Sequence, residues 1–180
     1  MAGSYDLTDH EGTFLSLVLR IQPVTAYQVI KIYEESPVSN FNTSKGKIYP
    51  LIRRLAERGL LDKRPVPNDG RGAEELICTA EGKKAVREWV TQIRPTHVLL
   101  DDPLRTKVQS FALLGRDEQI AWIVKAKELL HAKLAELDTY RDEVDVPFKD
   151  FLHDNAVQSV RARMDWLDRM LFAVMHGREG

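Results

Sequence analysis

The residues best suited to chemistry in this sequence are lysines and arginines gathered in one stretch. Eight of them lie between Asn40 and Gly72 against three acidic residues, while the whole chain has a net charge of -1. A basic segment in an otherwise weakly acidic chain is suited to binding a polyanion locally. A solvated helix face would have the same composition, so charge alone leaves both interpretations open.

The sequence offers little for catalysis or metal binding. It contains no glycine-rich phosphate loop and no nucleophile–histidine–acid arrangement, so we expect that the protein is not an enzyme. His131 and His153 have acidic neighbours at helical spacing, but no cluster of three or four metal ligands is visible. We therefore expect neither a metal ion nor another cofactor.

Composition indicates a globular protein of a reducing compartment. Hydrophobic residues make up 43% of the 180 residues, enough for a packed core. The single cysteine, Cys78, excludes an internal disulfide. No run of about 18 apolar residues is present, and the first residues lack the pattern of a signal peptide. We expect a cytoplasmic protein without a membrane segment.

The basic stretch has the pattern of an amphipathic helix over residues 44–58. Its apolar residues recur at intervals of three and four and fall on one face; they are Ile48, Leu51, Ile52 and Leu55. Gly59 supplies a left-handed stop after the helix. Lys45, Lys47 and Tyr49 then lie near its N-terminal end, which a recognition helix points into the major groove.

Pro50 is the anomaly in this helix. A proline in a helix interior removes one backbone hydrogen bond and disfavours the helical conformation of the residue before it. The sequence leaves two alternatives open: the helix starts late, near Gly46, or it kinks at Tyr49.

The elements around the basic helix form a recognisable order. Two helices precede the basic helix, and each begins at a capping box, the first at 8–11 and the second at 25–28. Two short strands, 61–66 and 74–78, follow it and flank a loop rich in turn formers. Thr79 caps a fourth helix, which contains Trp89 and ends before Pro95. Three helices followed by a projecting hairpin indicate a winged helix-turn-helix over residues 1–94.

The second half, residues 95–180, is predicted to be helical. Residues 94–103 have the composition of a linker, bracketed by two prolines. Helical segments are expected over about 103–114, 116–144 and 148–175. The fold class is thus mostly α with a small β-wing: a winged helix-turn-helix domain followed by a long-helix dimerisation domain.

The last of these helices carries an apolar seam with a period of 3.5 residues. The seam consists of Val157, Val160, Met164, Leu167, Leu171 and Val174. The preceding helix has a looser version. We expect the two seams to pack on each other and on a second copy of the chain. A purely intramolecular antiparallel hairpin is the alternative.

The run Gly46-Lys47-Ile48-Tyr49-Pro50-Leu51, with the residues after it, resembles the PadR family of winged-helix repressors. The continuing match comprises Arg53, Arg54, Leu55, Gly59 and Leu60, and the resemblance extends over about residues 14–90, where Tyr27, Thr79 and Gly82 also agree. There are departures from the family pattern. They are Lys47 and Ala26 in place of small residues, and Glu74 and Glu75 in the second strand of the wing.

The resemblance implies a transcriptional repressor that binds palindromic operator DNA as a homodimer. It also implies release from the double-stranded DNA by a small effector, in many members aromatic or phenolic. We predict that DNA is contacted by Thr43, Ser44, Lys45, Lys47, Tyr49, Arg53, Arg54, Arg64 and Arg71. Neutralising phosphates with such cations makes affinity fall steeply with salt.

The aromatic residues are candidates for an effector pocket. We select Trp89, Phe111 and Trp122, for which core packing is the alternative role. A different class of function also remains open: a winged-helix protein-interaction module without sequence-specific DNA binding. Glu74 and Glu75, which would repel phosphate, favour that alternative, whereas the basic residues around the predicted recognition helix favour DNA.

Overall fold

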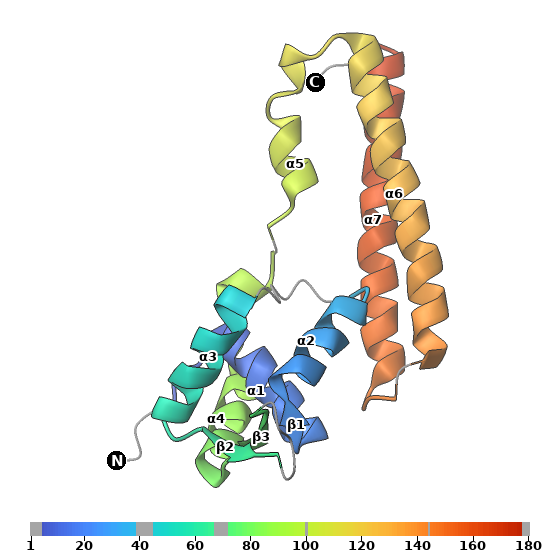
Figure 1. The fold of residues 1–180 in the computed structure, drawn as a ribbon. Helices are drawn as coiled ribbons and strands as arrows, with labels where there is room; N and C mark the ends of the chain where they lie inside the picture. Colours follow the sequence, from blue (N-terminus) through green and yellow to red (C-terminus); the bar gives the residue numbers. More distant parts are fainter. Residues whose placement is uncertain (1–4, 39–44, 67–71, 100, 144, 178–180) are drawn as a thin grey trace. The chain divides into compact units, whose positions relative to one another are not determined.

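The computed structural model describes residues 5–38, 45–66, 72–99, 101–143 and 145–177. The chain divides into two compact units, Met1–Leu99 and Leu100–Gly180 (Figure 1). The first unit contains four α-helices and a three-stranded antiparallel sheet within its described residues, and the described part of the second unit is helical. This is the expected fold class, mostly α with a small β-wing.

Local capping signals place the helices of the first unit. Helix α1 spans Asp9–Ile21 and α2 spans Ala26–Glu35. Both begin at a complete capping box, in which the threonine side chain accepts from the third helical amide and the Glu or Gln side chain accepts from the threonine amide. Helix α4, Ala80–Thr91, begins at Thr79, whose Oγ1 accepts from the Gly82 amide at 2.9 Å. The three predicted helix starts are confirmed.

The wing is a hairpin of strands β2 (Leu61–Pro65) and β3 (Glu74–Cys78). Their register runs from Leu61 opposite Cys78 to Pro65 opposite Glu74. A two-residue strand, β1 (Val24–Thr25), pairs with the other side of β3 and gives the order β1-β3-β2. The sequence did not indicate β1, because two residues are too few to show a period.

Helix α3 spans Lys45–Glu57 and includes Pro50. Pro50 has no amide to donate to the carbonyl of Gly46, so the helix lacks one interior hydrogen bond. The helix ends as the sequence predicts: Gly59 has a φ of 68°, its amide donates to the carbonyl of Ala56, and the Leu60 amide donates to that of Leu55. This pair of bonds is the Schellman motif.

The core of the first unit joins these helices to the sheet. Its fully buried large side chains are Leu7, Phe14, Leu15, Val18, Val29, Ile48, Leu55, Leu60, Leu61 and Leu76. Helix α3 contributes Ile48 and Leu55 from the predicted apolar face. The opposite face of α3 is therefore free to meet a ligand.

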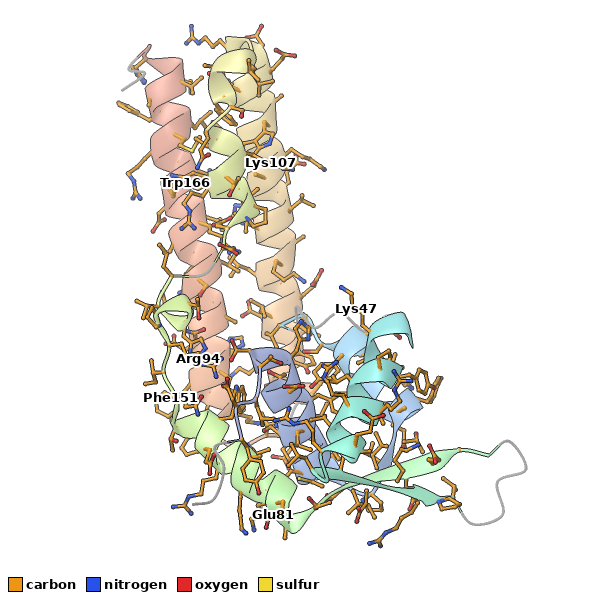
Figure 2. The ribbon with its side chains drawn as sticks, turned by 90° about the vertical axis from the view of Figure 1, so that its left-hand side faces the viewer. Lys47, Glu81, Arg94, Lys107, Phe151 and Trp166 are labelled. Carbon is orange, nitrogen blue, oxygen red and sulfur yellow. The ribbon has the colours of Figure 1, made fainter. Side chains whose placement is uncertain are left out.

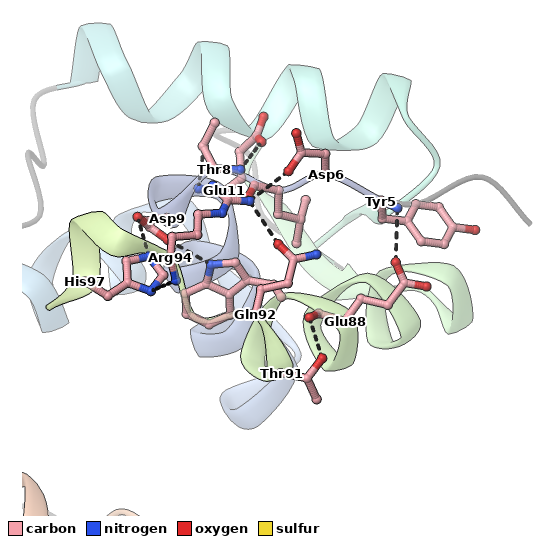
Figure 3. Close-up of polar contacts among 12 residues, drawn as sticks. Tyr5, Asp6, Thr8, Asp9, Glu11, Glu88, Thr91, Gln92, Arg94 and His97 are labelled. Carbon is pink, nitrogen blue, oxygen red and sulfur yellow. Dashed lines mark hydrogen bonds and ion pairs between the residues drawn. The ribbon is translucent and has the colours of Figure 1, made fainter.

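The chain that leaves α4 remains attached to the first unit. Arg94 Nη2 donates to Asp6 Oδ1 at 2.8 Å and to the carbonyl of Leu7 at 3.2 Å. In the short 3₁₀ helix η1 (Pro95–His97), His97 Nε2 lies 3.3 Å from Asp9 Oδ2 (Figure 3). These contacts explain why the first unit continues to Leu99, beyond the end at residue 94 that Pro95 suggested.

The second unit consists of α5 (Pro103–Val108), the 3₁₀ helix η2 (Phe111–Leu113), and two long helices, α6 (Arg116–Glu143) and α7 (Lys149–Met175). The helix expected over 103–114 is thus interrupted at a turn formed by Gln109 and Ser110. Helices α6 and α7 lie side by side, as Figure 1 shows. The two helices are close in sequence, so they form a helical hairpin.

The predicted seam of α7 packs within this hairpin. Val157, Val160, Leu167 and Val174 are buried together with Ile123, Ala126, Leu130 and Leu137 of α6. Met164 and Leu171 pack partly buried against the same cluster. Leu167 has 0% of its surface exposed within a single chain. The buried members of the seam therefore belong to the core of the hairpin within a single chain.

Candidate nucleic-acid interface

Helix α3 presents a polar face to solvent because its apolar face is committed to the core. Ile48, Leu51, Ile52 and Leu55 are each at most 5% exposed. On the outer side, Tyr49 is 52% exposed, the Arg53 side chain is 76% exposed, and Lys47 is exposed (Figure 2). Among the described residues, the anionic partner of Arg53 is Glu57, whose Oε1 lies 3.8 Å from Arg53 Nε.

Part of the predicted DNA-binding set lies outside the described residues. Thr43, Ser44 and Arg71 are in this group. Lys45 is the first residue of α3, and its side chain also falls outside the description. The described part of the predicted set is therefore Lys47, Tyr49, Arg53, Arg54 and Arg64.

Arg54 differs from Arg53 and Arg64 because its anionic partner is both close and buried. Its Nε donates to Glu11 Oε1 at 2.8 Å. Arg58, which follows α3, has its Nη1 3.2 Å from Glu11 Oε2. Glu11 is only 4% exposed, so a buried carboxylate holds both guanidinium groups on the α1 side of α3. Breaking such a pair from one side leaves a buried charge without compensation.

Glu11 also belongs to the capping box of α1. Its Oε2 accepts from the Thr8 amide at 3.1 Å, and its own amide donates to Thr8 Oγ1 at 3.2 Å (Figure 3). Burial raises the pKa of Glu11, but the hydrogen bonds from Arg54 and Thr8 and the charge of Arg58 outweigh it, so that the pKa lies below its ordinary value. Glu11 is therefore ionised at neutral pH.

The wing combines cations and anions in one small sheet. Lys63 Nζ lies 2.8 Å from Glu74 Oε2, and Arg64 is the cross-strand neighbour of Glu75. The Arg64 side chain is mostly exposed, and within the described residues its ion pair is a 4.0 Å approach to Asp62. Glu74 is thus neutralised within the sheet, and Arg64 remains open to a phosphate.

Trp89, the first aromatic candidate, packs on the backbone of α1. A Cβ placed on Gly12 would lie 2.2 Å from Cδ2 of the Trp89 indole, so only glycine leaves room for it. Trp89 Nε1 donates to Asp9 Oδ1 at 3.2 Å. That hydrogen bond, together with the hydrogen bond and charge of His97, lowers the pKa of Asp9 despite the opposing effect of desolvation. These contacts give Trp89 a packing role.

The other two aromatic candidates belong to the second unit. Phe111 and Trp122 form an edge-to-face pair with ring centroids 4.8 Å apart and an interplanar angle of 87°. Beside them, Gln119 Nε2 donates to the carbonyls of Phe111 at 3.0 Å and Leu114 at 3.3 Å. Its Oε1 is buried and has no hydrogen-bond partner among the described residues.

The described part of the chain contains no group of three histidine, cysteine or acidic side chains that could hold a metal ion. None of its helices is both long enough and apolar enough to cross a membrane.

Glu11 is the residue at this interface that sequence reasoning assigned to capping alone. The sequence does contain a signal for a second role. Glu11 precedes Phe14 and Leu15 by three and four positions, which places it on the buried face of α1. A carboxylate on an apolar helix face requires a cationic partner. The identity of that partner, 43 residues away, requires the fold.

Comparison with known proteins agrees with this architecture. Residues 14–88 match the model of the "Transcriptional regulator PadR-like family". No curated protein sequence matches the chain. Among solved structures, Bacillus subtilis PadR in complex with operator DNA has a TM-score of 0.75 at 19% identity, covering 91% of this chain and 98% of that one.

Two further structures have the same fold at the same identity. Bacillus subtilis PadR in complex with p-coumaric acid has a TM-score of 0.72 at 19% identity, covering 91% of this chain and 97% of that one. The PadR-like regulator BC1756 from Bacillus cereus has a TM-score of 0.74 at 19% identity, covering 94% and 99%. The likeness therefore extends over both units.

Proposed function

Residues 14–88 belong to the PadR-like family of transcriptional regulators, and from this premise we propose that the protein is a DNA-binding repressor. It binds palindromic operator DNA as a homodimer, with α3 of each copy in the major groove. One observation carries the proposal: α3 buries its apolar face in the core and presents Lys47, Tyr49 and Arg53 on its solvent side.

The phosphate-binding roles are assigned to exposed cations that have no close anionic partner among the described residues. Lys47 and Arg53 are exposed, and Arg64 projects from the wing strand β2. Arg54 is committed to Glu11, so we assign it to holding α3 rather than to a phosphate. Base discrimination then falls to residues near the start of α3, among them Lys47 and Tyr49.

A titration against duplex DNA from the promoter of its own gene tests this function. We expect fluorescence polarisation to give an affinity that falls linearly with salt on logarithmic axes, with a slope of about -0.9 for each phosphate neutralised. A scrambled duplex of the same length is the control and should bind more weakly. Binding that has no salt slope and no sequence preference would favour the protein-interaction module instead.

The homodimer is proposed from the apolar side chains that the hairpin leaves exposed. They lie around the start of α7 and are Phe148, Phe151 and Leu152. Phe151 alone is 75% exposed. Apolar side chains of this size, exposed close together, mark an interaction surface. A second copy that covers them brings two α3 helices into one assembly, and a palindromic operator has two half-sites for them.

Replacing Phe151 and Leu152 together by aspartate should weaken self-association without unfolding the hairpin. Each buried large apolar side chain contributes about 1.5–3 kcal/mol, so the dissociation constant should rise at least about tenfold. Sedimentation velocity over a range of concentrations measures it. Leu113→Asp, at another exposed apolar position of the second unit, is the matched control. An unchanged dissociation constant would place the dimer contact elsewhere.

An effector-binding role is proposed for Phe111 and Trp122 rather than Trp89. Trp89 is already packed on Gly12, whereas the Phe111–Trp122 pair lies beside Oε1 of Gln119. That oxygen has no partner in the described part of the chain and can accept a hydrogen bond from a hydroxyl group. An aromatic compound with a hydroxyl group fits this chemistry. Adding p-coumaric acid to the preformed complex tests it, because polarisation falls only if the duplex is released.

A further inference from the structure

We propose that Glu11 is a positioning residue for sequence recognition, because it fixes the placement of α3 on α1. The inference rests on the proposed function. It concerns a residue that contacts no DNA itself, since Glu11 is buried beneath α3. Its effect on DNA binding is exerted through the orientation of the helix that carries Lys47 and Tyr49.

The geometry that supports this role is a carboxylate whose two oxygens each have their own guanidinium partner. Oε1 accepts from Arg54, in the last turn of α3, and Oε2 lies beside Arg58, just past its end. Oε2 also accepts from the Thr8 amide at the start of α1. Two guanidinium groups one helical turn apart are therefore held by one side chain, which constrains the rotation of α3 as well as its position.

The turn of α1 that carries Glu11 is itself held from the other side. Trp89 packs on Gly12 and donates to Asp9, and Arg94 binds Asp6 and the Leu7 carbonyl (Figure 3). Glu11 thus connects α3 to a part of the first unit that has little freedom to move. A positioning contact needs such a fixed base, because otherwise the helix and its anchor would shift together.

An electrostatic role and a positioning role of Glu11 predict opposite changes in DNA affinity when this carboxylate is neutralised. If Glu11 acted only as a negative charge near DNA, its neutralisation would release Arg54 and Arg58 and would strengthen binding to every duplex. If Glu11 positions α3, neutralisation weakens binding to the operator, where base contacts need an accurate register, and spares non-specific binding, which needs only positive charge.

The test measures the specificity ratio, operator affinity divided by scrambled-duplex affinity, for the full chain and for Glu11→Gln. We expect the ratio to fall at least tenfold, with scrambled-duplex affinity equal to or above that of the unaltered protein. The Glu11→Gln substitution should also increase the rate of amide hydrogen exchange more in α3 than in α4. Glu57→Gln, an exposed glutamate of α3, is the matched control and should leave the ratio unchanged.

A Glu11→Gln protein whose ratio stays within threefold of the original overturns the inference, as does one that loses both affinities equally. If Glu11→Gln does not fold, Arg58→Gln is measured by the same criteria, because it keeps the carboxylate paired with Arg54. The unaltered protein is titrated first. If it shows no preference for the operator, the proposed function fails and the inference fails with it, whereas a clear preference that Glu11→Gln retains overturns the inference alone.

Discussion

Replacing Lys47 and Arg53 together by alanine should weaken operator binding at least about hundredfold while leaving the fold intact. A hydrogen bond to a charged group is worth about 1.5–3 kcal/mol, so losing these two contacts to DNA from each copy should cost at least about 3 kcal/mol, or two orders of magnitude. Both side chains are exposed, and among the described residues Arg53 gives up only the long pair with Glu57. Polarisation titrations at two salt concentrations and a thermal melt measure the two effects.

The salt dependence gives this prediction a second, independent readout. In a plot of log affinity against log salt concentration, the slope should become shallower by about 0.9 for each phosphate contact that is lost. This applies to each copy of the chain on the DNA. Lys83→Ala with Arg87→Ala is the control, since it removes the same two charge types from exposed positions of α4. If both double variants weaken binding equally, net charge rather than the face of α3 determines affinity, and α3 is not the recognition helix.

Leu167→Asp should unfold the second unit rather than only separate two copies of the chain. Leu167 has no exposed surface and lies in the α6–α7 core. Truncating a buried leucine side chain costs about 2–5 kcal/mol, and burying an unpaired carboxylate adds several more. Because domains are stable by only about 5–15 kcal/mol, the hairpin should not survive. Far-UV circular dichroism with urea titration measures the loss of helicity.

Ala162→Asp is the control for this variant, because it introduces the same charge at an exposed position of α7. It should cost about 1 kcal/mol or less, mainly through helix propensity. A Leu167→Asp protein with full helicity and an unchanged urea midpoint would contradict the hairpin core. Helicity retained in a protein that has become monomeric would instead restore the seam as the surface between copies.

Local signals explain how much of the first unit could be predicted from the sequence. A capping box occupies four residues, and a Schellman stop needs one glycine, so the starts of α1, α2 and α4 and the end of α3 follow directly from the sequence. The wing strands were predicted for the same reason, since turn formers separate them. The two residues of β1 form a strand only because β3 lies beside them.

The candidate site was harder to predict than the fold. Residue type alone identified the cations of α3. All three of Lys47, Arg53 and Arg54 are exposed, and the short ion pair with buried Glu11 then separates Arg54 from the other two. Nothing near Arg54 in the sequence reveals a partner in another helix. The seam of α7 shows the same limit, because a period of 3.5 residues identifies an apolar face without saying whether it meets another helix of the same chain or of a second chain.

The contacts of Arg94 with Asp6 and Leu7 bring the beginning and the end of the winged-helix unit together at one place. A purification tag fused ahead of Tyr5 would therefore lie next to the contacts that Arg94 makes with Asp6 and Leu7. Expression vectors for the titrations above should carry the tag at the opposite terminus. The same contacts tie the segment before α1 to the segment after α4, so a variant shortened past Asp6 or ended before Arg94 would lose this closure.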